Sequence, residues 1–454
     1  MDPGPGTPQY LCCNCVGDSF LSAEIKTKGT VASCEFCSSS AECLPISEVS
    51  ERVDEVFRAN FRLAEYAYGG YSGDYADGII SDMMGVDFEI AKAVLNHLAR
   101  LYWRDSSDGA GFYYADDEKY DQVEVGSLEY SWMWEEFCHS IIYVSRFFDD
   151  RAASYLEEIF SGIDRHQTAA GMSAVRTVDP ESEHSQVFRG RLADSSEDLL
   201  EIYLNPHTEL GPPPAHLASA GRMNPAGIPA FYGAFSRETC AAELRPAVGA
   251  IVASGAFEIT RPIKVLDLTV LDQHLLSASM FDPGYRQDSD QKSFLHDFHR
   301  QVRKPILPQE QDLQYLPTQA VAEFLSNRFK PRLDGVIYAS ALTGGENLNI
   351  ALFNHAARVE VPATTPEMIR SRPPLRGYFE HDSFVIQDNS QDGHAAQSDP
   401  LGVGRDYAHV FGGLMDLHHR SDGRVNTLRY VERSVELRRV ENNTVSTSLI
   451  TVLQ

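Results

Sequence analysis

Three residues near the middle of the sequence carry side chains that together could hold and act on a small anionic molecule. Arg222 lies in a segment rich in glycine and proline, Tyr232 follows ten residues later, and Glu243 follows eleven residues after that. The local pattern predicts a loop, a strand and a short helix, an order that can bring the three side chains to one cleft. Spacing alone, however, favours ordinary structural roles: a loop salt bridge, a core tyrosine and a solvated glutamate.

A second group of chemically capable residues lies near the N-terminus, where six of the eight cysteines occur within 43 residues. Two Cys-x-x-Cys pairs are separated by eighteen residues. Their members are Cys12, Cys15, Cys34 and Cys37. This spacing is typical of a zinc knuckle or ribbon, in which each pair aims two sulfurs at one tetrahedral ion. Cys13 and Cys43 are substitute ligands, and a reduced cysteine-rich segment without metal is the alternative.

A zinc ion held by four thiolates would organise folding, because no coordination position stays open for catalysis. We therefore assign residues 1–45 to a cysteine-rich segment that resembles a zinc knuckle.

The elements that follow this segment are expected to be mainly helical over residues 46–165. Apolar residues recur there at helical spacing. They include Val53, Val56, Phe57, Phe61, Val86, Ile90, Val94, Leu98 and Leu101. Residues 128–160 predict one buried helix whose aromatic side chains, Trp132 and Phe147 among them, belong to the core. The polar residues 164–186 show little periodicity and predict a connection between domains.

The sequence pattern of the second half of the chain predicts an α+β domain. Short apolar or β-branched runs predict strands at 228–235, 250–259, 263–268, 335–339 and 348–353. Helical patterns lie between them, at 239–244, 292–302 and 318–329. After residue 362 the pattern weakens into loops, and strand-like character returns over residues 425–453.

Composition excludes some classes of partner. A formal net charge of -26 disfavours binding to nucleic acid and to acidic membrane surfaces. No apolar run has the length of a bilayer, and the first residues do not resemble a secretion signal, so a cytoplasmic location is expected. Local arginines can still hold a small anion, since a close and partly buried contact is screened less than distant surface charge.

The segment around Arg222 resembles the RES domain, the toxin component of RES-Xre toxin–antitoxin pairs. The hallmarks of that family are a Gly-Arg-Trp-Asn-Pro-like loop, a tyrosine on the next strand and a helix that carries a glutamate. The loop residues that match are Gly221, Arg222, Asn224, Pro225 and Gly227. Met223 stands where the family usually has tryptophan, which puts the ring-packing role in doubt but not the arginine.

Other blocks extend the resemblance over residues 187–353, and we place the RES catalytic domain at 187–360 and a C-terminal extension at 361–454. Arg189 is the first choice for the arginine of the family's opening strand, and Arg191 is the second. A later block contains Tyr338 and ends at Ser340. The N-terminal half resembles the HEPN/RES N-terminal domain that is often fused to RES domains. The Arg-x4-6-His motif of HEPN ribonucleases is absent from its helical part, so no ribonuclease activity is expected.

The resemblance implies an ADP-ribosyltransferase-like fold that cleaves NAD at the bond between nicotinamide and ribose. It implies catalytic roles for Arg222, Tyr232 and Glu243. It also implies an NAD-binding set made of Arg189, Arg191, Asn224, Tyr338 and Ser340. In this scheme Glu243 stabilises the ribosyl cation, the arginines hold the pyrophosphate, and Tyr232 lends a ring and a hydroxyl to the nicotinamide ribose.

The acceptor of the ADP-ribosyl group stays open at this point. Water would make the protein a glycohydrolase, inorganic phosphate a phosphorylase, and a protein side chain a transferase. A regulatory module that binds NAD or a partner without turnover is the rival from another class. An Xre-like antitoxin, or regulation in cis by the N-terminal domain, is the expected restraint, and the sequence does not determine the oligomeric state.

Overall fold

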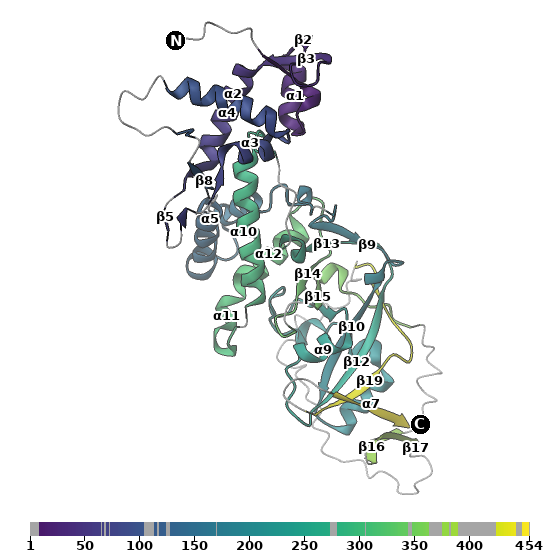
Figure 1. Cartoon of the computed structure of the whole chain (residues 1–454). Coiled ribbons are helices and arrows are strands. Elements are labelled where there is room, and N and C mark those ends of the chain that lie inside the picture. Colours follow the sequence, from purple (N-terminus) through teal and green to yellow (C-terminus); the bar gives the residue numbers. More distant parts are fainter. Residues whose placement is uncertain are drawn as a thin grey trace, which may run out of the picture. The chain divides into compact units, whose positions relative to one another are not determined.

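The computed structural model describes residues 9–64, 66–67, 70–71, 73–103, 113–115, 118–123, 128–168, 170–272, 279–304, 306–343, 347–362, 375–380, 383–388, 424–441 and 447–453. The chain divides into two units, and Figure 1 labels many of their elements. Unit 1 consists of Met1–Ser131 and Leu276–Leu295, and unit 2 consists of Trp132–Leu275 and His296–Gln454.

Unit 1 begins with a small antiparallel sheet whose strand order is β1-β3-β2. Its elements are β1 (Tyr10–Cys12), the 3-10 turn η1 (Cys13–Cys15), α1 (Ser19–Lys28), β2 (Thr30–Ser33) and β3 (Ser40–Pro45). The Asp18 side chain starts α1 by accepting a hydrogen bond from the backbone N–H of Leu21. Gly29 ends the helix where a Cβ would lie only 2.7 Å from the carbonyl oxygen of Cys43, so the helix packs closely on β3.

The predicted amphipathic helices of unit 1 are present. They are α2 (Ile46–Asn60), α3 (Ala76–Met84) and α4 (Phe88–Trp103), joined in this unit by the first part of α10 (Tyr285–Arg303). Val53, Phe57, Val94 and Leu98 are buried in one core, as expected. Leu101 is exposed instead. Short strands complete the unit: β4 (Phe61–Leu63), β5 (Tyr66–Ala67), β6 (Gly70–Tyr71), β7 (Asp74–Tyr75) and β8 (Lys119–Gln122).

The prediction of one buried helix over residues 128–160 is wrong. The segment forms α5 (Leu128–His139), one π-helical turn η3 (Ser140–Val144) and α6 (Asp150–Ile159). Asp149 marks the start of a separate helix, because its carboxylate caps α6. It accepts hydrogen bonds from the backbone N–H groups of Arg151 and Ala152. Trp132 is 52% exposed and Phe147 is 87% exposed, so these rings do not lie in the core.

Unit 2 is built on a twelve-stranded mixed sheet. Its combination of strands and helices confirms the mixed α and β domain expected from the sequence. The strand order is β16-β17-β20-β19-β12-β10-β11-β15-β14-β13-β9, and β18 pairs with β12. The first strands are β9 (Val175–Val178), β10 (Gln186–Ala193), β11 (Phe231–Ala234), β12 (Ile251–Ile259), β13 (Ile263–Asp267), β14 (Gly335–Ala339) and β15 (Leu348–Leu352). The last are β16 (Leu375–Glu380), β17 (Ser383–Asp388), β18 (Leu428–Tyr430), β19 (Glu436–Val440) and β20 (Thr447–Leu453).

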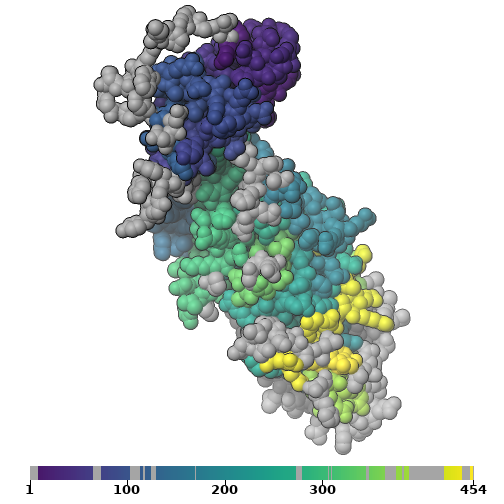
Figure 2. Space-filling model, in the orientation of Figure 1, coloured from purple at the N-terminus to yellow at the C-terminus, as the bar shows by residue number. Residues whose placement is uncertain are grey.

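Two segments that were expected to be loops contain strands of this sheet. β9 lies within the predicted interdomain connection and pairs with β13. β16 and β17 form an antiparallel hairpin after residue 362, and β17 pairs with β20. In Figure 2 the yellow C-terminal residues lie beside teal residues from the middle of the chain, in agreement with the pairing of β19 with β12. The apolar pattern of these strands is short or irregular, so it did not predict them. They are stabilised by pairing with neighbouring strands, which local sequence does not show.

The helices of unit 2 include α5 from Trp132 onward and α6, which precede its first strand. The others are α7 (Ser196–Leu204), α8 (Pro206–Glu209), α9 (Arg237–Glu243), the end of α10, α11 (Gln311–Gln314) and α12 (Leu316–Asn327). Phe231 and Phe257 pack edge to face in the core of the unit, with ring centroids 5.2 Å apart. Among the described residues, no helix combines the length and the apolar character needed to cross a membrane.

Candidate functional site

Three neighbouring strands bring chemically active side chains to one face of the sheet of unit 2. Tyr232 on β11 lies opposite Ala351 on β15, and Tyr338 on β14 lies opposite Asn349 on β15. Residues that face each other across strands, or that are two apart on one strand, point to the same side. The register therefore places Tyr232, Tyr338 and Asn349 on the same face.

Glu243 is held over this face by a short helix and two hydrogen bonds. Ser236 caps α9 by accepting a hydrogen bond from the backbone N–H of Thr239, so the helix begins directly after β11 and ends at Glu243. Glu243 Oε1 accepts hydrogen bonds from Ser340 Oγ at 2.7 Å and from Asn349 Nδ2 at 2.6 Å. The other oxygen, Oε2, has no hydrogen-bond partner among the described residues. The carboxylate is thus oriented through one oxygen and offers the other.

The two residues that orient Glu243 are themselves buried. Ser340 has no exposed surface, and its Oγ also accepts a hydrogen bond from the backbone N–H of Leu342. Asn349 is 2% exposed, and its Oδ1 is a buried acceptor without a partner in the described part of the chain. An orphaned buried oxygen is rare in native proteins and marks a place where a ligand or a water donates.

The glycine-rich loop before β11 is organised by Asn224. Asn224 Nδ2 donates to the carbonyl oxygens of Ser219 and Ile228, while its Oδ1 accepts from the hydroxyl of Tyr232 at 2.8 Å. The same hydroxyl accepts a hydrogen bond from the backbone N–H of Met223 at 2.9 Å. Asn224 and the hydroxyl of Tyr232 therefore hold the loop in this structure, and the ring of Tyr232 lines the pocket.

Gly221 is required by this arrangement. A Cβ at that position would lie 2.6 Å from both Asn224 Oδ1 and the hydroxyl oxygen of Tyr232, closer than real Cβ contacts. The Met223 side chain, which follows Arg222 in the loop, is buried. The loop that carries Gly221 and Asn224 therefore packs tightly against Tyr232.

Arg222 projects from this loop toward the helices that follow it in unit 2. Its Nη2 donates to the carbonyl oxygen of Lys304, and its guanidinium lies 5.6 Å from the ring centre of Tyr315. The backbone is fixed by Thr318, whose Oγ1 donates to the carbonyl oxygen of Arg222 at 2.7 Å. Burial lowers the pKa of Arg222.

Arg189 and Arg191 have different surroundings, although they are two residues apart on β10. The guanidinium of Arg189 contacts the ring of Phe231 at 5.4 Å, and its Nη1 is buried with no partner among the described residues. Burial lowers the pKa of Arg189 to about 10, so the group is still charged at neutral pH. Arg191 is partly exposed and pairs with Glu209. The structure therefore brings Arg189, and not Arg191, to the site.

Two adjacent pockets contain these residues, with volumes of about 320 Å³ and 270 Å³. Glu243 and Tyr338 line both pockets. The first pocket also contains Arg222, Arg245, Arg303 and Tyr315, and the second contains Arg189, Tyr232, Cys240 and Asn349. Burial raises the pKa of Tyr232 and of Tyr338, which keeps both phenols neutral. Burial also raises the pKa of Cys240 to about 12, so its thiol stays protonated.

Sequence reasoning missed Asn349 and Arg245. Asn349 is a single polar residue in an apolar strand, and only the register shows that it lies opposite Tyr338. Arg245 follows the end of α9 with a φ of 47°, a left-handed conformation that usually belongs to glycine. A non-glycine residue in this region marks a backbone held by its surroundings and is frequent at functional sites.

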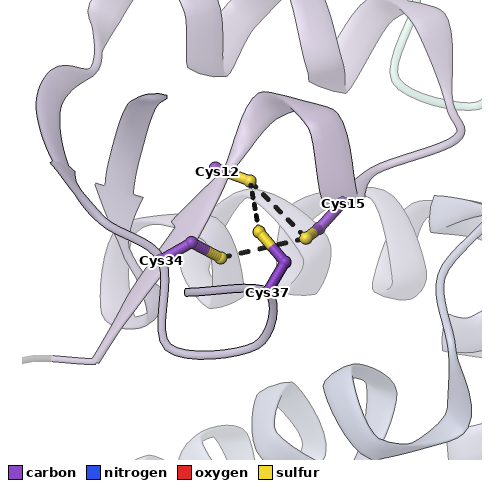
Figure 3. A group of neighbouring side chains, drawn as sticks. All are labelled: Cys12, Cys15, Cys34 and Cys37. Carbon is purple, nitrogen blue, oxygen red and sulfur yellow. Dashed lines mark hydrogen bonds between the residues drawn. The ribbon is translucent and has the colours of Figure 1, made fainter. Parts of the chain in front are cut away.

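The four cysteines of the two Cys-x-x-Cys pairs are brought together in unit 1. The sulfur atoms of Cys12, Cys15, Cys34 and Cys37 all lie within 4.8 Å of one another (Figure 3). The two substitute ligands are not part of this group. Cys13 Sγ lies near the side chains of Asn14 and Glu42, and Cys43 Sγ donates to backbone carbonyl oxygens.

Of the comparisons with known proteins, one gives a match, and it covers one part of the chain. No curated protein and no solved structure matches the chain. These comparisons lend no support to the expected HEPN/RES identity of the N-terminal half, which stays a prediction. The RES resemblance is confirmed for the segment that carries Arg222, Tyr232, Glu243, Tyr338 and Ser340, because residues 201–371 match the family model of the RES domain.

Proposed function

We propose that this chain cleaves NAD at the bond between nicotinamide and ribose. The RES domain is associated with NAD-related toxin activity in general, and the match covers residues 201–371. The single observation that carries the proposal is the state of Glu243. Its Oε1 is fixed by Ser340 and Asn349, while Oε2 remains available at the meeting point of two pockets.

The chemistry of NAD suits such a carboxylate. The pyridinium ring is already positive, so the pair of electrons of the breaking bond moves to the ring nitrogen and nicotinamide leaves as a neutral molecule. What needs help is the oxocarbenium ion that develops on the ribose. A fixed carboxylate such as Glu243 stabilises that charge electrostatically and binds ribose hydroxyls, a contribution of about 3–4 kcal/mol for one well-placed group.

The arginines supply the binding energy for the rest of the substrate. Arg189 carries a buried charge, and its Nη1 has no partner among the described residues, an arrangement that costs free energy unless an anion binds there. Planar guanidinium groups pair with phosphate oxygens through two parallel hydrogen bonds. We assign the pyrophosphate to Arg189 and Arg222, which line the two pockets that meet at Glu243.

The remaining residues position the ribose and the nicotinamide. Tyr232 and Tyr338 present neutral rings on the same face of the sheet, and aromatic walls favour flat ligands. Ser340 acts through Glu243, because its hydroxyl is already bonded to that carboxylate. An ADP-ribosyltransferase-like fold remains part of this proposal.

The acceptor distinguishes three enzymes that share this first step. In hydrolysis a water oxygen bonds to the anomeric carbon and its proton passes to solvent or to Glu243 Oε2. In phosphorolysis an oxygen of inorganic phosphate takes that place. We favour these two over transfer to a protein, because the resemblance to the RES domain points to NAD degradation.

The direct experiment incubates the purified chain with NAD and follows nicotinamide release by chromatography, with and without inorganic phosphate. The proposal predicts release by the wild type and its loss in Glu243→Ala and Arg222→Ala. ADP-ribose as product identifies a glycohydrolase, and its phosphate ester at the anomeric carbon identifies a phosphorylase. Negligible and equal release by all three proteins under both conditions would contradict the proposal.

The toxin character can be tested in a host cell. We expect expression of the wild type to slow growth and to deplete NAD, and Glu243→Ala to relieve both effects. The restraint on this activity, whether an Xre-like antitoxin or the N-terminal half in cis, is a separate prediction. Faster nicotinamide release after removal of the N-terminal half would support regulation in cis.

A further inference from the structure

The sulfur atoms near the N-terminus have the spacing that a tetrahedral metal site requires. Cys12 Sγ lies 3.5 Å from Cys15 Sγ and 3.6 Å from Cys37 Sγ, and Cys15 Sγ lies 3.8 Å from Cys34 Sγ. Zinc–sulfur bonds of about 2.3 Å at tetrahedral angles place two ligand sulfurs about 3.8 Å apart. The observed edges therefore fit one ion at the centre of the four sulfurs (Figure 3).

Two short turns aim the sulfurs inward. Cys12 ends β1 and Cys15 ends the turn η1, whereas Cys34 follows β2 directly and Cys37 lies in the turn before β3. The second turn is closed by a hydrogen bond of 2.9 Å from the backbone N–H of Ser38 to the carbonyl oxygen of Cys34. A bond from the N–H of Glu35 to the carbonyl oxygen of Tyr10 joins the two turns.

The same sulfurs do not form disulfides. A disulfide bond is about 2.05 Å long, well below the shortest observed separation of 3.5 Å between Cys12 and Cys15. Cys12 and Cys34 are buried, Cys15 is partly buried, and Cys37 is exposed. Thiols form only weak hydrogen bonds with one another, so their close grouping contributes little stability by itself. Four thiolates around a metal ion are instead stabilised by bonds to that ion.

We propose that Cys12, Cys15, Cys34 and Cys37 bind one zinc ion that fixes the N-terminal sheet of unit 1. The ion joins β1 and η1 to the turn between β2 and β3, which the short strands alone hold only weakly. With four thiolates the coordination shell is complete, so the role of the ion is structural. This inference does not rest on the proposed NAD chemistry, because no residue of the two catalytic pockets belongs to unit 1.

The first test is the metal content of the full-length protein purified without a metal-affinity step. Elemental analysis should find one zinc per chain. Titration with a thiol-specific mercurial should release that zinc into a zinc-sensitive dye. Replacement by cobalt should give the visible absorption bands of a tetrahedral cobalt–thiolate centre. A protein without bound metal, or one that holds iron in place of zinc, would overturn the inference.

Substitutions then identify the ligands. Cys12→Ala and Cys34→Ala each remove one sulfur from a different pair, and both should abolish the stoichiometric zinc. Cys13→Ala is the matched control. Cys13 is buried and lies between Cys12 and Cys15 in the sequence, but its sulfur is outside the four-sulfur group. Full zinc in Cys12→Ala, or loss of zinc in Cys13→Ala alone, would contradict the assignment. If a variant fails to fold, the mercurial titration of the wild type still decides.

Discussion

The cysteine group of unit 1 and the Glu243 pockets of unit 2 are assembled in opposite ways. The four cysteines come from two short motifs within 26 residues, and each contributes the same atom to one centre. The pocket residues come from strands, a loop and a helix spread between Arg189 and Asn349, and each contributes different chemistry. Local spacing is therefore enough to specify the first site, whereas the second exists only when the sheet has its register.

This contrast has a consequence for mutations. Removal of any of the four sulfurs should have the same effect, since each is one corner of a tetrahedron. Changes in the pockets should have graded and distinct effects, because some residues bind substrate, some orient Glu243, and some hold the loop.

After Glu243 itself, the largest of the graded effects is expected at Asn349. Asn349→Ala removes one of the two hydrogen bonds that orient Glu243, and a hydrogen bond to a charged group is worth about 1.5–3 kcal/mol. We expect kcat for nicotinamide release to fall by about 10- to 100-fold with little change in KM. Asn327→Ala, on the exposed face of α12, is the control. A rise in KM with kcat unchanged would assign Asn349 to substrate binding instead.

The next effect concerns the loop. Tyr232→Phe keeps the ring but deprives Asn224 Oδ1 and the N–H of Met223 of their shared partner. We expect the free energy of unfolding, measured by denaturant titration, to fall by about 1–3 kcal/mol. An unchanged stability with a lost activity would show that the hydroxyl serves the substrate rather than the loop.

How much of this could be predicted from the sequence follows the same division. Local pattern and the RES resemblance predicted the pairing of the four cysteines, the loop with Arg222, the strand with Tyr232 and the helix that carries Glu243. Asn349 and Arg245 were not, since neither register nor a left-handed backbone has a local signal. The exposed rings of Trp132 and Phe147 contradict the prediction of a buried helix. The prediction failed because apolar periodicity does not show where a helix is interrupted.

Arg189 and Arg191 allow a comparison within one strand. In the part of the chain that the structure describes, Arg189 Nη1 is buried without a partner, and such a charge opposes folding. Arg189→Met should therefore raise the melting temperature of the free protein, and it should raise KM for NAD by about tenfold or more. Arg191→Met removes only an exposed pair with Glu209 and should change neither quantity appreciably. Equal effects of the two substitutions on KM would remove the reason for choosing Arg189.

The pH dependence of this gain has a definite sign. Burial lowers the pKa of Arg189 to about 10, so folding is opposed wherever the group is charged. The cost is fully present below that pKa and diminishes as the pH rises through it. The stability gained by Arg189→Met should thus be the same in mildly acidic and neutral solution and should shrink in strongly alkaline solution. A gain that varies around neutral pH would point to another group.

The smallest expected effect links the two regions. Extraction of zinc with a chelator should expose residues 9–45 to a protease, because the N-terminal sheet loses its metal. Nicotinamide release per folded chain should not change, since all residues that line the two pockets belong to unit 2. If activity is lost together with zinc, the separation between a structural and a catalytic site fails.

The central claim is that Glu243 stabilises the ribosyl cation. Its most direct test compares steady-state nicotinamide release by Glu243→Gln and by Glu238→Gln, a change of the same kind on the same helix at an exposed residue that pairs with Arg438. We predict that Glu243→Gln lowers kcat by about 10²- to 10³-fold with KM for NAD nearly constant, and that Glu238→Gln matches the wild type. Equal kcat values for the two variants would contradict this account of the site.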